Sequence, residues 1–173
     1  MAWIMGGVPN DLRLDEIDRE LLRALAEDAR MPNNKLAERA GVAPSTALQR
    51  VRALRAAGVL RGFHADIDLA ALGRPLQALV AIRLSSHSRE QIDSFTGTVR
   101  RLPGVLSVFH LAGATDYLVW LAAPDAQGLR EFVVDHLATH PAVAHAETSL
   151  IYEHHRGPGA LADVAPPERA PGA

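Results

Sequence analysis

The stretch from Ala43 to Gly58, APSTALQRVRALRAAG, most constrains the fold, because it has the pattern of a helix with one exposed face. Pro44 suits the first turn of a helix, where its fixed φ angle is already helical, and Gly58 suits a helix end. At 100° per residue, four apolar side chains gather on one arc, which predicts a packed face. They are Ala47, Leu48, Val51 and Leu54. The opposite face is predicted to be free for binding.

The positive charge of the chain is concentrated around this helix. Residues 43–63 contain no acidic residue, whereas the whole chain has a formal net charge of −2. The basic residues of this segment are Arg50, Arg52, Arg55 and Arg61. A near-neutral protein with one basic segment fits local binding of an anionic partner better than indiscriminate binding of nucleic acid.

Two further helices are predicted directly before this stretch. Apolar residues recur at helical spacing after Leu14, and Asp15 and Asp18 have the spacing of a capping box. This first helix ends before Pro32, and a short second helix ends at Gly41. Helix, short helix, glycine turn and helix is the order of a helix-turn-helix domain.

A second domain is predicted after the basic helix. Residues 59–68 alternate loosely and predict a strand or wing, followed by a hinge near Leu72–Pro75. The rest of the pattern gives strand, helix, strand, strand, helix and strand. The expected bounds are 77–84, 89–102, 105–111, 117–122, 125–139 and 143–152. This βαββαβ order packs two helices on one face of a four-stranded antiparallel sheet.

The expected fold class is therefore α+β. A winged helix-turn-helix domain covers 14–62, a linker strand and hinge cover 63–76, and a ferredoxin-like βαββαβ domain covers 77–156. Residues 1–13 are predicted to be a flexible extension, and the proline-rich residues 157–173 a disordered tail.

Several classes of protein are disfavoured by composition. The chain has no cysteine, which excludes disulfides and thiolate metal sites. It has neither a secretory signal nor an apolar run near the ~18–20 residues that span a bilayer. We therefore expect a cytoplasmic protein without a membrane partner.

The exposed face of the basic helix carries the side chains that are expected to bind double-stranded DNA. Gln49 and Arg50 are expected to read base edges, because a bidentate pair with adenine or guanine contributes ~1–3 kcal/mol of discrimination. Ser45 and Thr46 are further candidates, and Arg52 is expected to contact a phosphate. The alternative is that these arginines form an ordinary solvated helix face.

Two further expectations concern this interface. Arg55 falls beside the apolar arc and is not expected to provide specificity. A single copy of the patch would bind weakly, so the sequence favours an even-numbered oligomer that binds repeated half-sites.

A resemblance to a known family rests on three runs of sequence: LDEIDRELLRALAEDAR, LAERAGVAPSTALQRVRALRAAGVLRGFHADIDLAALG and LPGVLSVFHLAGATDYLVWL. From residue 14 to about residue 155, the chain resembles the leucine-responsive and asparagine-operon (Lrp/AsnC) family of transcription regulators. The resemblance implies an amino-acid-sensing, RAM-type second domain. It also implies homodimers that join through the βαββαβ sheets and often assemble into octamers, and regulation by a small effector, usually an amino acid.

The loop before the third predicted strand is the candidate effector site. An α-amino group would pair with the carboxylate of Asp116, and an α-carboxylate would accept hydrogen bonds from Gly113, Thr115 or Thr148. Tyr117 follows directly and is included in the site. From the residues alone, a plain hairpin turn is the alternative. The resemblance favours an effector site, because the family's glycine and aspartate correspond to Gly113 and Asp116, although many relatives carry an extra acid after the glycine.

The histidines do not predict a metal site. His136 and His140 have i, i+4 spacing on a predicted helix, and His154 and His155 lie near the end of the last predicted strand, but no third ligand converges with either pair. No phosphate-binding glycine loop, nucleophile elbow or pair of catalytic carboxylates is recognisable. We therefore expect no enzyme, no catalytic residue, no metal and no cofactor.

The sequence predicts a homo-oligomeric, sequence-specific DNA-binding transcription regulator of the Lrp/AsnC type. A small effector at an oligomer interface would act by changing the geometry of the assembly. Two alternatives stay open: an effector-independent architectural DNA-binding protein, and a small-molecule-binding module with weak DNA binding.

Overall fold

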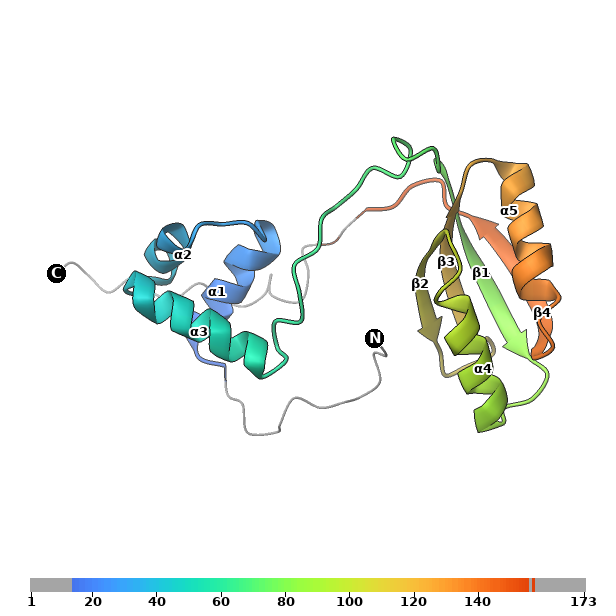
Figure 1. Ribbon diagram of the computed structural model, residues 1–173, viewed down its shortest axis with the longest axis horizontal. Coiled ribbons are helices and arrows are strands. Elements are labelled where there is room, and N and C mark those ends of the chain that lie inside the picture. The colour runs from blue at the N-terminus through green and yellow to red at the C-terminus, as the bar shows by residue number, and fades with distance from the viewer. Residues whose placement is uncertain (1–13, 156, 158–173) are drawn as a thin grey trace. The chain divides into compact units, whose positions relative to one another are not determined.

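The computed structural model describes residues 14–155 and residue 157. The chain divides into two compact units, the first containing residues 14–66 and the second residues 67–155 (Figure 1). The predictions for residues 1–13 and for the tail beyond residue 157 lie outside the described residues. No helix of the described part has the length and apolar character needed to cross a membrane.

The first unit consists of three helices, α1 (Glu16–Glu27), α2 (Asn33–Ala40) and α3 (Pro44–Ala56). They enclose a core whose buried members are Leu21, Ala24, Leu25, Leu36, Ala37, Ala40 and Ala47. The predicted helix-turn-helix order is thereby confirmed.

Local sequence signals set the ends of these helices. The predicted capping box at the start of α1 is confirmed, since the carboxylates of Asp15 and Asp18 each accept a hydrogen bond from the other residue's amide. Gly41 ends α2 with a positive φ of 65°, a conformation that costs glycine little. Asn33 donates a 2.8 Å hydrogen bond to the carbonyl oxygen of Pro44, which ties the start of α2 to the start of α3.

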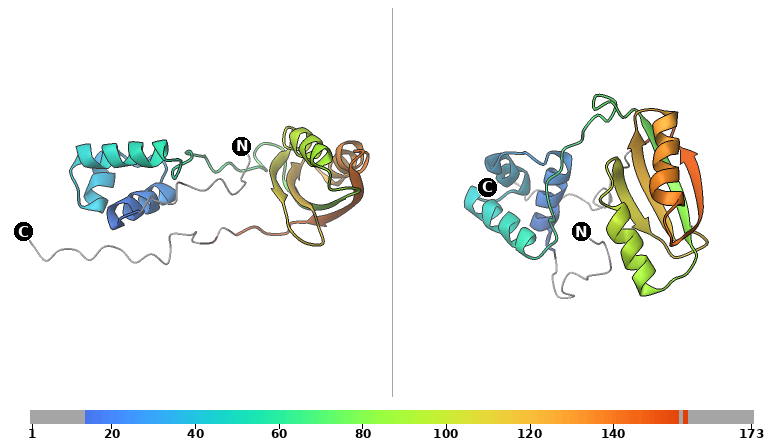
Figure 2. Two further views of the ribbon diagram at one scale, coloured as in Figure 1. Left: turned by 90° about the horizontal axis from the view of Figure 1, so that it is seen from below. Right: turned by 45° about the vertical axis from the view of Figure 1, so that its right-hand side comes forward.

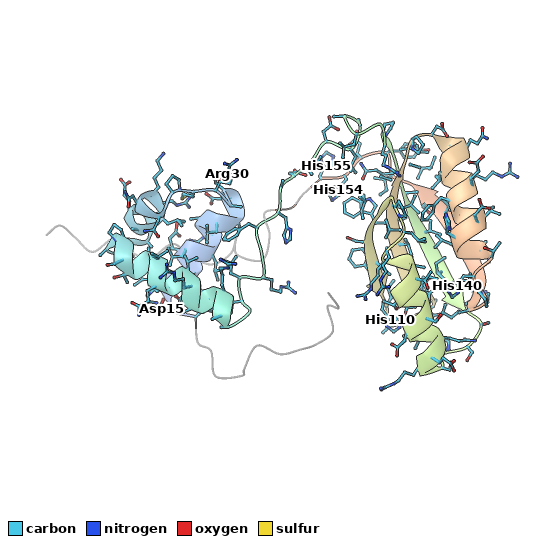
Figure 3. All side chains as sticks on the ribbon, viewed as in Figure 1. Asp15, Arg30, His110, His140, His154 and His155 are labelled. Atoms are coloured by element: carbon cyan, nitrogen blue, oxygen red, sulfur yellow. The ribbon has the colours of Figure 1, made fainter. Side chains whose placement is uncertain are left out.

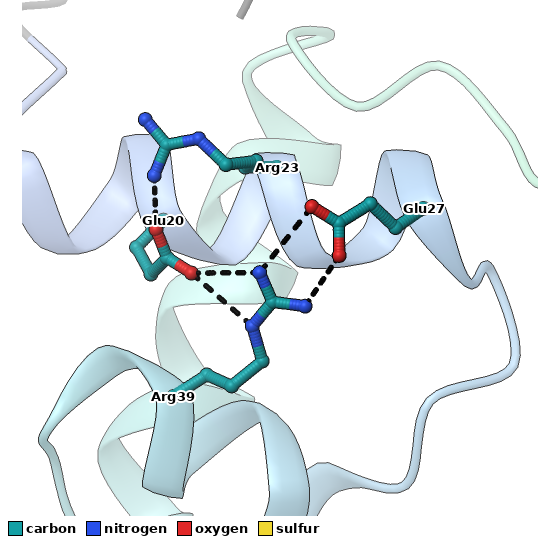
Figure 4. Close-up of polar contacts among 4 residues, drawn as sticks. All are labelled: Glu20, Arg23, Glu27 and Arg39. Atoms are coloured by element: carbon teal, nitrogen blue, oxygen red, sulfur yellow. Dashed lines mark hydrogen bonds and ion pairs between the residues drawn. The ribbon is translucent and has the colours of Figure 1, made fainter. Parts of the chain in front are cut away.

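A buried carboxylate joins α1 to α2 (Figure 4). Glu20 is only 6% exposed and pairs with Arg23 and, at 3.1 Å, with Arg39. Arg39 also pairs with Glu27 at 2.5 Å. A buried acid without such partners would cost roughly 1–3 kcal/mol or more. The network therefore stabilises the packing of the two helices that support α3.

Two expectations for this unit are wrong. Leu48 is 41% exposed, because its side chain points about 100° away from the buried Ala47 and so lies at the margin of the packed face. The strand or wing predicted at residues 59–68, most of which belong to this unit and all of which are described, does not form. A strand needs a neighbour to pair its backbone groups, and the described part of this unit is otherwise helical.

The second unit is a four-stranded antiparallel sheet in the order β2-β3-β1-β4. Its strands are β1 (Leu76–Leu84), β2 (Val105–His110), β3 (Tyr117–Ala123) and β4 (Val143–Leu150). Its helices are α4 (Arg89–Val99) and α5 (Ala126–Phe132), followed by the π-helical segment η1 (Val133–Ala138). The expected βαββαβ order is thereby confirmed, and the predicted helix 125–139 is α-helical only in its first half.

Both helices cover the same face of the sheet (Figure 2). Val80 at the centre of β1 is fully buried there, opposite Val119 of β3. Because side chains alternate along a strand, the neighbouring residues Leu79 and Ala81 lie on the opposite face, which we call the open face.

Candidate DNA interface and effector site

The outer surface of α3 is defined by the burial of its inner surface. Ala47 is fully buried in the core of the first unit. Ser45, Gln49 and Arg52 follow at i, i+4 and i+7 on the side away from Ala47, and all three are exposed. We call these three residues the outer stripe. Thr46 is half-buried beside it. The outer stripe combines a hydroxyl, an amide and a guanidinium group.

Arg50 does not belong to the outer stripe. Its guanidinium group lies 2.5 Å from a carboxylate oxygen of Asp15 and 3.0 Å from one of Asp18, so it binds the capping box of α1. Figure 3 shows Asp15 beside α3. Burial raises the pKa of Asp15, but the amide of Asp18 and the guanidinium of Arg50 outweigh it, so the pKa lies below its usual range. Arg50 thus links α3 to the first turn of α1.

Asp116 is a buried, satisfied carboxylate. It is 8% exposed, accepts a 2.7 Å hydrogen bond from the amide of Leu84, and lies 2.7 Å from Nε2 of His87. The Leu84 amide lowers the pKa of Asp116 most strongly, burial opposes this, and the nearby His87 and His110 lower it further, so the pKa lies below its usual range. Asp116 therefore joins its loop to the end of β1.

Tyr117 lies in the core of the second unit. It is fully buried, its hydroxyl is 2.9 Å from that of Thr96 on α4, and its ring stacks on His110 with the centroids 4.5 Å apart. Burial raises the pKa of its hydroxyl. Thr148 lies opposite Val80 in the register, so it belongs to the helix-covered face. The structure does not bring these two side chains together.

A hollow of about 240 Å³ lies on the open face beside the candidate loop. Its lining comes from the end of β1, the loop before β3, and β4: Ala81, Ile82, Arg83, Ala114, Thr115, His145 and Glu147. Of the predicted effector residues, only Thr115 lines it, while the exposed Gly113 lies two residues away with φ 156°. The hollow presents a cation, Arg83, and an anion, Glu147.

Sequence reasoning missed Arg83, Glu147 and the His87 partner of Asp116. The strand register could have revealed the first two, because β1 and β4 pair Ala81 with Glu147 and Arg83 with His145. No local pattern indicates the contact of His87 with Asp116, since the two residues are far apart in the sequence.

Among the described residues, no three or more His, Cys, Asp or Glu side chains lie close enough together to hold a metal ion. His140 instead packs its ring edge against Phe95, with the centroids 5.3 Å apart, and accepts a hydrogen bond from the amide of Ala142. His136 packs against the ring of Phe132.

The lowered pKa of Asp116 predicts an acid-sensitive contribution to stability. Its ionised form is favoured in the folded state, so the stabilisation is present above the unfolded pKa of about 3.9 and is lost as the pH falls through the lower folded value. Asp116→Asn should therefore reduce stability at pH 7 and flatten its fall between about pH 5 and pH 2. The measurement is urea unfolding followed by Trp120 fluorescence in a Trp3→Phe background. An unchanged slope against pH would contradict the assignment.

Comparisons with known proteins agree with both units. The family model for the AsnC-type helix-turn-helix domain matches residues 14–55, and that for the Lrp/AsnC ligand binding domain matches residues 77–159. The chain is 49% identical over 158 residues to the HTH-type transcriptional regulator AldR of Mycolicibacterium smegmatis, covering 90% of this chain and 92% of that protein.

Two solved structures extend this likeness. The crystal structure of AldR from Mycobacterium tuberculosis is 47% identical, with a TM-score of 0.69, covering 83% of this chain and 98% of that one. A transcriptional regulator from Neisseria meningitidis, solved as a complex with L-Met, is 32% identical, with a TM-score of 0.78, covering 84% and 94%. These relatives are transcription regulators and not enzymes. The chain therefore belongs to the Lrp/AsnC family of ligand-responsive, DNA-binding transcription regulators.

Proposed function

We propose that α3 enters the major groove of operator DNA with its outer stripe facing the bases. The observation that carries this proposal is the position of Ser45, Gln49 and Arg52 on the exposed side opposite the buried Ala47. The amide of Gln49 matches the donor and acceptor of adenine, the guanidinium of Arg52 suits a phosphate, and the hydroxyl of Ser45 suits either. Thr46 lies beside the outer stripe and would contact the sugar–phosphate backbone of the DNA.

Arg50 acts on specificity through the orientation of α3. Its guanidinium group is paired with two carboxylates, so both ion pairs would have to break before Arg50 could bind a guanine. The same ion pairs fix α3 against the first turn of α1. Arg50 is therefore a positioning residue for the outer stripe, and it would read a base only after exchange of these partners.

Substitutions separate base reading from positioning. Gln49→Ala should lower affinity for operator DNA by roughly 5- to 150-fold, the equivalent of the ~1–3 kcal/mol of a bidentate base contact, with little effect on a mixed-sequence duplex. Fluorescence anisotropy of the full chain measures both affinities, with an operator selected from a random-sequence pool. Equal losses on the two duplexes would contradict the role of Gln49.

The same assay tests Arg50. The double variant Asp15→Asn, Asp18→Asn releases Arg50, and if Arg50 is a positioning residue, the ratio of specific to non-specific affinity falls as it does in Arg50→Ala. If Arg50 reads a base, release raises that ratio. Using the ratio removes the general gain in affinity that follows from deleting two negative charges near DNA.

We further propose that the hollow on the open face binds the α-ammonium and α-carboxylate groups of a free amino acid. Arg83 would pair with the α-carboxylate and Glu147 with the α-ammonium group, while Thr115 and the amide of Gly113 supply further donors. Asp116 contributes by holding the loop against β1. The L-Met complex of the Neisseria meningitidis regulator supports an amino acid as the class of ligand.

Calorimetry with the twenty amino acids tests this site. Glu147→Gln and Arg83→Gln should each weaken binding of the amino acid that binds the wild type roughly tenfold or more, because a lost charge-assisted pair costs about 1.5–3 kcal/mol. Thr148→Val, one residue along β4 on the other face, is the matched control and should bind normally. The site would be contradicted if Thr148→Val lost binding while Glu147→Gln and Arg83→Gln bound the amino acid normally. If none of the twenty binds, the architectural alternative is favoured.

The open face also fits a contact between two copies of the chain. Leu79, Leu118 and Trp120 lie half-buried on it, and Phe109 is 47% exposed. We propose a homodimer in which two sheets face each other, with further assembly to an octamer. A partner would then cover the hollow on the open face, so an amino acid that binds one arrangement better shifts the assembly and with it the spacing of the DNA-binding helices.

Sedimentation velocity tests the dimer. Phe109→Glu places a charge on the proposed interface and should dissociate the full chain to monomers at micromolar concentration. Leu72→Glu, at a residue that is 61% exposed before β1, should leave the assembly unchanged. A Phe109→Glu protein of wild-type size would exclude this interface.

A further inference from the structure

Three arginines surround a second hollow at the C-terminal end of α3. Its volume is about 440 Å³, and it lies entirely within the first unit. The lining residues are Arg52, Arg55, Ala56, Gly58, Leu60 and Arg61. We call this feature the arginine hollow. Segment 43–63, which forms it, contains no acidic residue.

The backbone after α3 builds the arginine hollow. Gly58 adopts a φ of 74°, which turns the chain, and the amides of Val59 and Leu60 both donate to the carbonyl oxygen of Leu54 at 3.0 and 3.1 Å. This fold-back brings Arg61 to the last turn of the helix. The arrangement is therefore fixed by backbone hydrogen bonds.

The side chains of the arginine hollow are also arranged locally. Arg52 and Arg55 are three residues apart, so they are neighbours on the surface of α3. The guanidinium carbon of Arg55 lies 5.8 Å from the centroid of the Phe63 ring, a cation–π distance. This contact restrains the Arg55 side chain, which is exposed at the rim of the arginine hollow.

The length of α3 relates the arginine hollow to the outer stripe. From Ser45 to Arg55 the helix axis rises about 15 Å, at 1.5 Å per residue. The major groove is about 12 Å wide. A helix whose N-terminal half contacts bases therefore reaches the phosphates that border the groove with its C-terminal end.

We propose that Arg52, Arg55 and Arg61 together bind the phosphate backbone of one DNA strand at the border of the groove that the outer stripe enters. Guanidinium groups suit phosphate because they donate two parallel hydrogen bonds to its oxygens. The inference rests on the proposed DNA-binding function and extends it. It gives Arg55 and Arg61 the role of anchors that strengthen binding without selecting sequence.

The salt dependence of DNA binding tests this proposal in the full chain. The slope of log affinity against log salt concentration is negative, and each phosphate contact makes it steeper by about 0.9. Arg55→Gln and Arg61→Gln should each make the slope shallower by about 0.9 for every DNA-bound copy, and the double variant by about 1.8. The affinities for operator and mixed-sequence duplexes should fall by the same factor, leaving their ratio unchanged.

Two further variants serve as matched controls for this test. Arg30→Gln removes one exposed charge in the turn between α1 and α2 and should leave the slope unchanged. The double variant Arg55→Lys, Arg61→Lys keeps the charges and should retain the slope, which separates phosphate binding from loss of fold. A wild-type slope in the glutamine double variant would overturn the proposal, as would a fall in the specificity ratio. Failure of the proposed base reading by the outer stripe has a different signature, because Gln49→Ala would then leave the specificity ratio intact while the salt dependence still changed in the arginine variants.

Discussion

The burial of Ala47 against α1 and α2 determines what the first unit can do. With this side chain fully enclosed, the opposite side of α3 must face solvent, and that side carries the outer stripe. A helix that could rotate about its axis would present a different set of side chains to DNA. The ion pairs of Arg50 with Asp15 and Asp18 add a second restraint at the edge of the same helix. Under the proposed function, DNA recognition by this unit would thus depend on contacts within the protein as well as on contacts with the bases.

The central strand has a comparable role in the second unit. Because β1 pairs with both β3 and β4, its alternation assigns one set of side chains to the core and the other to the open face. Val80 and Ile82 belong to the core that packs against α4 and α5, whereas Ala81 and Arg83 line the hollow on the open face. Core and candidate site are therefore set by the same register, so a one-residue slip of β1 would destroy both.

Much of this architecture follows from the sequence because periodicity and local end signals are strong. The capping box of α1, the left-handed Gly41 and the proline start of α3 each depend on neighbouring residues, and the structure has all three. The prediction of a strand at 59–68 was wrong because alternation of apolar and polar residues does not by itself supply a second strand to pair with. The prediction that Leu48 is packed was wrong because the arc of apolar residues on α3 is wider than the surface that contacts α1 and α2.

The candidate sites were less accessible to sequence reasoning because they depend on contacts between distant residues. The partners of Arg50 are more than thirty residues away in the chain, and nothing near Arg50 indicates that carboxylates approach it. Asp116 looked available to a ligand, but Leu84 and His87 already satisfy it. Thr148 and Glu147 are adjacent in sequence, and only the register shows which of them reaches the open face.

Hydrogen exchange of the full chain tests the central claim that the two units bind two different ligands. Operator DNA should slow exchange in peptides covering residues 44–61, and a bound amino acid should slow it in peptides covering 79–85, 113–116 and 143–149. DNA that protects the sheet while leaving residues 44–61 unchanged would contradict the account.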